Sequence, residues 1–164
     1  MRLVECVVDA DDVDGFVERL AELGDAHGAT VQAFDARYVV DRTHLERAVE
    51  LADRERGRGE AIANDRAMEI LLYAAGRRQI DRALELGVDA GGTPAVVLVD
   101  GGDETAAADA VRGLDAVRPA ETLGDYDEDR VREFFDVNDA ELAAADGDLP
   151  ALVHERVALL VVER

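Results

Sequence analysis

The stretch P-A-V-V-L-V-D, from Pro94 to Asp100, decides the fold. It is apolar at every position before its final aspartate, and β-branched valine dominates it. Because successive side chains of a strand point to opposite faces of a sheet, a run with no polar alternation is buried on both faces. The stretch therefore predicts the central strand of a sheet.

Two other strands and a series of helices are predicted on either side of this run. Leu3 to Val8 is short and rich in β-branched residues, and Thr30 to Phe34 alternates as T-V-Q-A-F. Apolar residues at helical spacing predict the intervening helices. These helices are expected over residues 13–23, 43–56, 65–75, 78–86, 105–112, 127–135, 139–145 and 149–162.

Local signals predict where two of these helices begin and end. Thr43 and Glu46 have the spacing of a capping box, in which a hydroxyl and a carboxylate satisfy backbone N–H groups reciprocally. Asn64 is a suitable N-cap for the next helix, and Gly76 is well placed to end it. No repeat or long linker divides the chain. We therefore expect one domain over residues 1–164, an α/β fold with a small mixed β-sheet flanked by a majority of helices.

The composition is strongly acidic. The 164 residues include 38 carboxylates and 18 basic residues, all of them arginine, for a net charge of −20 and a pI near 4.3. Apolar periodicity from end to end argues against a disordered acidic chain. An acidic coat keeps proteins apart in a salt-rich cytoplasm, where ions screen its self-repulsion. The composition thus indicates a folded protein of halophilic type, and it says little about partners.

The residue inventory argues against an autonomous enzyme. The chain has no Gly-rich phosphate-binding motif and no serine, and its single cysteine, Cys6, lies in a predicted strand. His27, His44 and His154 are far apart and lack metal-ligand spacing. We expect no metal and no cofactor. The amino terminus does not resemble a secretory signal and no run is long enough to span a membrane, so we expect a cytoplasmic protein.

Positive charge is concentrated in one quarter of the chain. Residues 42–82 contain nine arginines and eight acids, a net of +1, which leaves −21 for all other residues. One explanation is helix-surface ion pairing together with cations at helix ends. The other is contact with phosphate, because a guanidinium fork binds phosphate oxygens bidentately. The Arg77–Arg78 pair lies beside a glycine, where its forks are less constrained.

Tyr73 and Glu69 are the polar residues that bear on the second explanation. Tyr73 either offers a ring face to an unstacked base or is half-buried with its hydroxyl in water. Glu69 either orients Arg66 or accepts a hydrogen bond from a base or ribose. The pattern alone leaves these alternatives open.

Several segments resemble one protein family. The segment M-E-I-L-L-Y-A-A-G-R-R-Q-I, which follows Asn64 closely, is the most specific of them. The likeness extends over most of the chain through four further segments. These are R-A-L-E-L-G-V, T-P-A-V-V-L-V, H-L-E-R-A-V and the carboxyl-terminal A-L-V-H-E-R-V-A-L-L. Together they resemble the kinase-binding regulatory subunit of the KEOPS complex, the TPRKB family.

The resemblance implies a small, non-catalytic α/β protein that docks on the atypical kinase/ATPase subunit of KEOPS. That complex installs threonylcarbamoyl on the adenosine beside the tRNA anticodon, and archaeal members of the family bind the single-stranded CCA end of tRNA. The RNA site expected here comprises Asn64, Arg66, Glu69, Tyr73, Arg77, Arg78 and Gln79. The residues expected to meet the kinase are Leu152, Val153, Arg156, Val157 and Leu160.

Two other functions are compatible with the same sequence. The chain can be an interaction module that regulates the kinase without touching RNA. It can also be an independent enzyme acting on a small ligand or nucleotide, although the missing nucleophile, metal site and phosphate loop argue against this. Loss of RNA binding on replacing the arginine pair separates the first two functions, and turnover by the isolated chain identifies the third.

Overall fold

The computed structural model describes residues 1–162 of the chain, and its centre is a four-stranded sheet. The strands are β1 (Arg2–Ala10), β2 (Thr30–Asp35), β3 (Gly91–Asp100) and β4 (Val117–Pro119). The helices are α1 (Val13–His27), α2 (Arg42–Gly57), α3 (Arg66–Ala75), α4 (Ile80–Ala83), α5 (Glu104–Arg112), α6 (Glu128–Phe134), α7 (Asp139–Ala144) and α8 (Leu149–Val162). Two short 3₁₀ helices are η1 (Ala36–Tyr38) and η2 (Leu84–Leu86).

The prediction of a central strand is confirmed. The strand order is β2-β3-β1-β4, and β3 pairs with β1 from Gly91 to Val99 and with β2 from Ala95 to Asp100. All pairs are antiparallel, so the sheet is not mixed as expected. Strand direction depends on how the intervening helices turn the chain, which a single apolar run does not reveal. The α/β class and the helical majority are confirmed.

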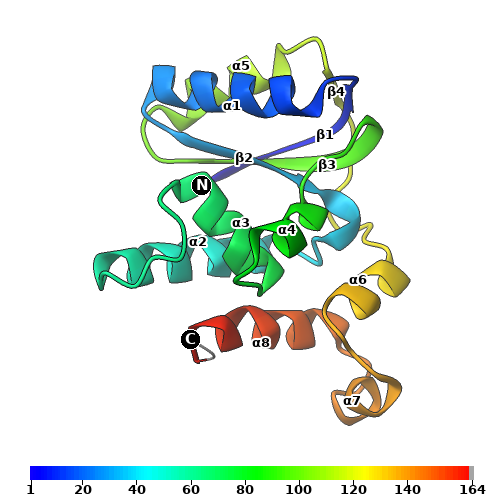
Figure 1. Cartoon of the computed structure of the whole chain (residues 1–164). Coiled ribbons are helices and arrows are strands. Elements are labelled where there is room, and N and C mark those ends of the chain that lie inside the picture. Colours follow the sequence, from blue (N-terminus) through cyan, green and yellow to red (C-terminus); the bar gives the residue numbers. More distant parts are fainter. Residues whose placement is uncertain (163–164) are drawn as a thin grey trace.

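Each face of the sheet carries its own core. Alternate residues of β3 divide between the two, with Val97 and Val99 on the side of α1 and α5, and Val96 and Leu98 on the side of α2 and α3. Figure 1 shows the resulting layers, with α1 and α5 above the sheet and α2, α3 and α4 below it. Cys6 lies in the first core and is fully buried.

The last helix, α8, forms an outer layer beneath α2 and α3 (Figure 1). It lies far from the sheet, so its inner face packs on other helices. Gly76, which ends α3 in the left-handed conformation (φ 61°), lies directly against it. A Cβ atom at Gly76 would come within 3.1 Å of the Arg156 carbonyl oxygen. The prediction that Gly76 ends α3 is confirmed, and the close approach gives a second reason for glycine there.

The predicted N-caps of α2 and α3 are wrong. Helix α2 begins after Asp41, whose carboxylate accepts the His44 N–H at 2.8 Å, and Thr43 lies inside the helix. Helix α3 begins after Asp65, whose carboxylate accepts the Met68 N–H at 3.3 Å. In both cases an aspartate adjacent or close to the expected cap takes the role, since aspartate is at least as good a cap as threonine or asparagine.

The connection between α3 and β3 also differs from the prediction. Residues 78–86 were expected to form one helix, but α4 is a single turn and η2 continues it as a 3₁₀ turn. Ile80 and Leu84 are exposed, whereas Ala83 and Leu86 are buried. The three-residue β4, which ends at Pro119, has no predicted counterpart because a strand so short carries too little pattern. None of the helices within residues 1–162 is long and apolar enough to cross a membrane.

Candidate partner and nucleic-acid interfaces

Glu69 is a structural residue of α3. Its side chain is fully buried, and its carboxylate accepts the Ile62 N–H at 3.0 Å and the Ala63 N–H at 2.6 Å. It therefore fixes the loop that joins α2 to α3. Neither expected role is met, because the carboxylate is not exposed to a nucleotide and Arg66 bonds to other residues.

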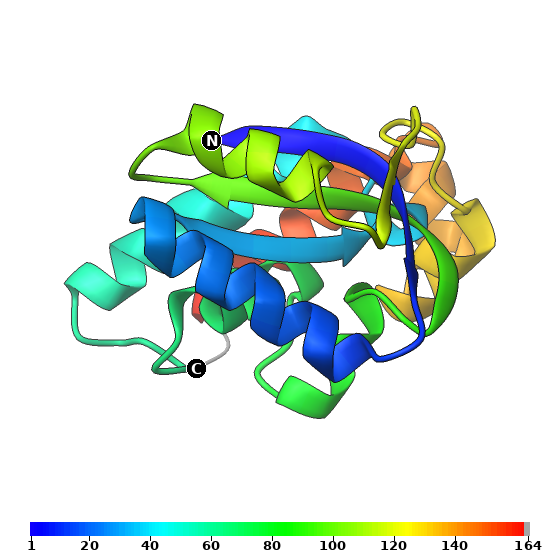
Figure 2. The ribbon, with the colours of Figure 1, turned by 90° about the horizontal axis from the view of Figure 1, so that it is seen from above.

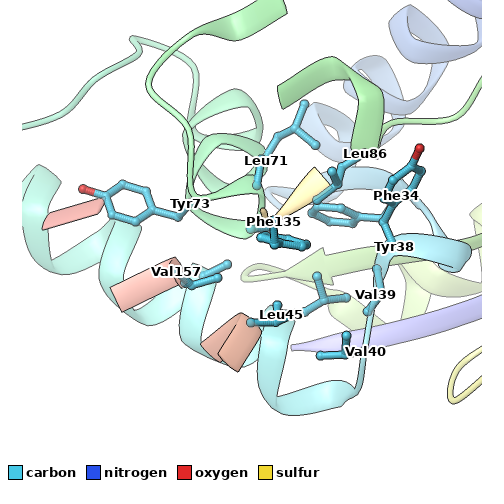
Figure 3. Packing of buried hydrophobic residues seen from close by; sticks show 14 of the residues in the cluster. Phe34, Tyr38, Val39, Val40, Leu45, Leu71, Tyr73, Leu86, Phe135 and Val157 are labelled. Atoms are coloured by element: carbon cyan, nitrogen blue, oxygen red, sulfur yellow. The ribbon is translucent and has the colours of Figure 1, made fainter. Parts of the chain in front are cut away.

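Tyr73 is likewise buried, with 1% of its surface exposed. Figure 3 shows its ring in the packed cluster that also contains Phe135 and Val157. A base cannot stack on a ring that is covered on both sides by the protein's own side chains. The structure therefore corrects the prediction for Tyr73 and Glu69, which lie one turn apart on the inner side of α3.

Arg66 is held by a network of polar groups. Its Nε and Nη2 bond to the Asp53 carboxylate at 2.9 and 2.8 Å, and Nη2 also bonds to Asp100 at 2.7 Å. Nη1 donates to the Thr30 hydroxyl at 2.9 Å. The hydrogen bond to Asp53, followed by that to Asp100, raises the pKa of the guanidinium above its ordinary value. With both acids already paired, this arginine has little capacity left for a phosphate.

The Arg77–Arg78 pair contacts backbone carbonyls of the carboxyl-terminal helices. Arg77 Nη2 donates to the Phe134 carbonyl, and its guanidinium carbon lies 5.1 Å from the centre of the Phe134 ring. Arg78 Nη2 lies 3.4 Å from the Leu160 carbonyl, in the last turn of α8, where a cation also complements the helix dipole. This explains why paired arginines follow α3. They join its carboxyl-terminal turn to α6 and α8.

Asn64 and Gln79 are the exposed members of the expected RNA site. The Asn64 carbonyl accepts a hydrogen bond from Arg56 Nη2 at 3.0 Å, and its side chain lies on the surface. Gln79 precedes α4 and makes no side-chain capping bond. Thus the structure brings together only part of the set, and it does so at two separate places, before α3 and after it.

The carboxyl-terminal end of α2 carries exposed positive charge. Arg54 is exposed, and Arg58, with 58% of its side chain exposed, lies 3.4 Å from the Glu55 carboxylate. Both are in the same short stretch as Arg56, which bonds to the carbonyls of Ala63 and Asn64. These arginines fall within the arginine-rich residues 42–82, but they are not among the residues expected to bind RNA.

Four of the five residues expected to meet the kinase are buried within the chain. Leu152, Val153, Val157 and Leu160 are at most 8% exposed and belong to the core below the sheet. The fifth, Arg156, donates to the Phe135 and Asp136 carbonyls and pairs with Glu141 at 2.6 Å. A partner can touch none of the four apolar side chains in this conformation. These four residues form the inner face of α8, which packs on the protein's own helices.

The outer face of α8 is the accessible one, and it is also largely apolar. Ala151, Glu155 and Val162 are exposed, and Ala158 and Leu159 are partly exposed. Val162, with 76% of its surface accessible, is the most exposed large hydrophobic residue within residues 1–162. A helix that is apolar nearly all round normally lies inside a protein. The sequence signal was present in L-P-A-L-V-H-E-R-V-A-L-L-V-V, which has hydrophobic residues on both faces.

Polar contacts fix α8 against the start of α2. His154 Nε2 lies 2.8 Å from Oδ1 of Asp41, the N-cap of α2. One turn into α2, His44 is fully buried, with Nδ1 accepting the Val40 N–H and Nε2 bonded to the Ala74 carbonyl. Burial lowers the pKa of His44 to about 4. Its ring is therefore neutral near pH 7, with one nitrogen as acceptor and the other as donor.

No cluster of three or more histidine, cysteine or carboxylate side chains with metal-binding geometry occurs among residues 1–162. In comparisons with known proteins, no curated protein matches the chain. A family model described as "Kinase binding protein CGI-121" matches residues 16–160. The match covers most of the 164 residues, and the chain belongs to this family.

Proposed function

We propose that this protein is a non-catalytic subunit of the KEOPS complex that binds the complex's atypical kinase/ATPase subunit. Membership of a kinase-binding family and the exposed apolar face of α8 support the proposal. Interfaces between permanent partners resemble a protein core cut in half, and most residues on this face are apolar. The acidic composition fits a salt-rich cytoplasm, where apolar contact is strengthened and charge steering is screened.

The single observation that carries the kinase interface is the exposure of Val162 on a helix whose inner face is fully packed. Replacing Val162 with Asp adds a charge to the exposed apolar face at the end of α8 and leaves the core untouched. We expect binding to the purified kinase subunit to weaken by about tenfold or more, an effect of about 1.4 kcal/mol. Isothermal titration calorimetry in molar KCl measures it.

Ile80→Asp is the matched control, because Ile80 is a similarly shaped residue with 48% exposure on α4. Its affinity for the kinase should stay within error of the unaltered protein. Equal affinities for Val162→Asp and the unaltered chain would rule out this face of α8. Val157→Asp is unsuitable as a test, because Val157 is fully buried and its replacement unfolds the helix packing.

We further propose that the subunit recruits tRNA through its CCA end, using the surface at the end of α2. The support is the net +1 charge of residues 42–82 on a chain of −20, together with the exposure of Arg54, Arg58 and Asn64. Unpaired bases and phosphates of a single strand are the groups that arginine and asparagine side chains bind. In molar salt, counterion release contributes little, so directed hydrogen bonds and stacking must carry the affinity.

The test compares tRNA with and without its CCA tail, using the unaltered chain and the double variant Arg54→Gln, Arg58→Gln. We expect the tail to increase affinity and the double variant to lose that increase. Arg112→Gln, at an exposed position of α5, is the matched control. Equal binding of both RNAs would refute the mode of recognition. It would favour the alternative of a regulatory module that binds the kinase without RNA contact.

A further inference from the structure

A groove of about 400 Å³ runs along the outer edge of β2. Helix α1 forms one wall, and α3 with η2 forms the other. Seen from above, β2 is the strand of the sheet nearest to α1 (Figure 2). None of the residues expected to contact RNA or the kinase lines this groove. It is therefore a separate feature of the surface.

The floor of the groove is the main chain of β2. Four consecutive residues, 30 to 33, line it. Side chains of consecutive strand residues point to opposite faces of a sheet, so all four can line one groove only by presenting the strand's edge. The strand order places β2 at the end of the sheet, with β3 as its partner among the described strands.

The hydrogen-bonding groups of alternate β2 residues face this groove. In an antiparallel pair, the N–H and C=O groups of one residue point to the same side, and the side alternates along the strand. The Ala33 carbonyl accepts the side-chain amide of Gln32 at 2.8 Å. Ala33 therefore faces the edge, and Val31, two residues earlier, faces it too. Gln32 shields this edge, which is one way proteins prevent unwanted strand pairing.

The walls of the groove are apolar and accessible. Val17 on α1 is 49% exposed and Leu84 on η2 is 53% exposed, and both line the groove from opposite sides. Leu20 and Met68 extend the two walls inward. Four large hydrophobic residues are strongly exposed within residues 1–162, and two of them are therefore at this one site. Exposed apolar residues gathered around a concavity mark a binding surface.

Acidic residues lie at the ends of the groove. Asp14 and Asp25 are at opposite ends of α1, and Asp65 precedes Arg66, which bonds to Thr30 at the start of β2. No arginine within residues 1–162 lines the groove. An apolar centre between acidic ends favours a ligand with an apolar middle and cationic ends. It disfavours a polyanion such as RNA.

We propose that this groove binds an extended peptide segment of a partner protein, in which a short apolar run is bounded by basic residues, as a fifth strand on β2. Main-chain hydrogen bonds between the peptide and residues Val31 and Ala33 replace the hydrogen bond from the Gln32 side chain to the Ala33 carbonyl. The apolar side chains of the segment pack alternately against the wall of α1 and the wall of α3 and η2. This is strand addition at a free sheet edge, and it does not depend on the kinase or tRNA interfaces.

The probe is a fluorescein-labelled hexapeptide with four central valines and an arginine at each end, titrated with the full chain. Fluorescence anisotropy should show saturable binding. Leu84→Arg should weaken it by about tenfold, because it removes apolar contact and adds a like charge. Ile80→Arg, with similar exposure nearby but outside the groove lining, is the matched control and should bind as the unaltered chain does.

Two peptide variants test the main-chain and charge components separately. N-methylation at alternate valines removes hydrogen-bond donors without removing apolar surface, and it should abolish binding. Glutamate in place of both arginines should weaken binding, and the Asp14→Asn, Asp25→Asn protein should lose most of this discrimination. Binding that is indifferent to N-methylation would show an apolar site without strand addition, and this would overturn the proposal.

Hydrogen exchange locates the bound peptide on the protein. The amide protons of Val31 and Ala33 should exchange more slowly in the complex, whereas those of Gln32, already bonded within the sheet, should change little. Absence of saturable binding up to about 1 mM, where the binding energy is only about 4 kcal/mol, contradicts the proposal. So does displacement of the peptide by a short RNA ending in CCA that protects the same amides.

Discussion

Glu69 is a fully buried carboxylate on a protein whose other acids mostly lie on its surface. Its position is stable because two backbone N–H groups, from Ile62 and Ala63, donate to it. Burial of an ionised group is costly unless such charge-assisted bonds are made. Glu69 thus holds the loop between α2 and α3, which is rich in arginine and glycine, in one conformation. Asn64 lies at the end of that loop.

Replacing Glu69 with Gln should therefore loosen this loop. The amide is neutral and can accept less strongly from two donors, so we expect a loss of about 1.5–3 kcal/mol in the free energy of unfolding. Urea denaturation measures it, together with faster hydrogen exchange at Ile62 and Ala63. Glu18→Gln, on the exposed face of α1, should change stability by less than about 0.5 kcal/mol. Equal effects of the two variants would show that the buried bonds contribute nothing.

His44 makes stability depend on pH in a defined window. Burial lowers its pKa in the folded state to about 4, from an ordinary value of 6.5. Because the unfolded chain binds the proton more readily, this contribution to stability is complete above pH 6.5 and is lost as the pH falls toward 4, by up to about 3 kcal/mol. The His44→Gln variant should be less stable than the unaltered protein at pH 7. Its stability should, however, fall less steeply between pH 6.5 and pH 4. His27→Gln is the control, and it should retain the full slope in urea titrations.

Among the helices, Gly76 allows α3 and α8 to approach closely. Gly76 has φ of 61°, a conformation that costs other residues about 1–2 kcal/mol, and its missing side chain admits the α8 backbone. Gly59 has φ of 74°, and a Cβ atom built there would meet nothing within 4 Å. The pair of glycines therefore separates the backbone effect from the packing effect.

Gly59→Ala should destabilise the protein by the backbone effect alone, about 1 kcal/mol. Gly76→Ala should cost about 1–3 kcal/mol more, because the new methyl group pushes against the Arg156 carbonyl. Thermal unfolding of both variants gives the comparison. If the two variants unfold at the same temperature, α8 yields to the methyl group and the close approach is not a constraint.

The sequence predicts the helices and strands better than it predicts the exposure of single residues. The apolar run 94–100 and the helical pattern of 149–162 identify their elements, because burial imposes the composition and the spacing directly. The RNA residues were chosen by chemical type, and type does not distinguish a guanidinium that binds phosphate from one that binds a carbonyl. Arg77 and Arg78 show this, since their partners, Phe134 and Leu160, are 57 and 82 residues away along the chain.

For the whole molecule, the net charge limits which kinds of contact can form a partner interface. Many arginines of residues 42–82 are engaged in contacts within the chain, such as Arg66 with Asp53 and Asp100. The net charge of −20 already counts these arginines, so the acids in excess are left without a cation. Neutral contacts must then make a large share of any partner interface, in agreement with the apolar face of α8 and the apolar groove beside β2.

The same net charge predicts that salt stabilises the fold. Self-repulsion of surface acids opposes the compact state, and raising KCl from about 0.1 to 1 M shortens the screening length from about 10 to 3 Å. The melting temperature should rise steeply over this range and then level off, whereas salting-out by sulfate continues to raise it. The triple variant Glu18→Gln, Glu121→Gln, Glu133→Gln, altered at exposed positions, should start from a higher melting temperature at low salt and gain less. Parallel curves for the two proteins would mean that KCl acts on apolar burial and not on charge.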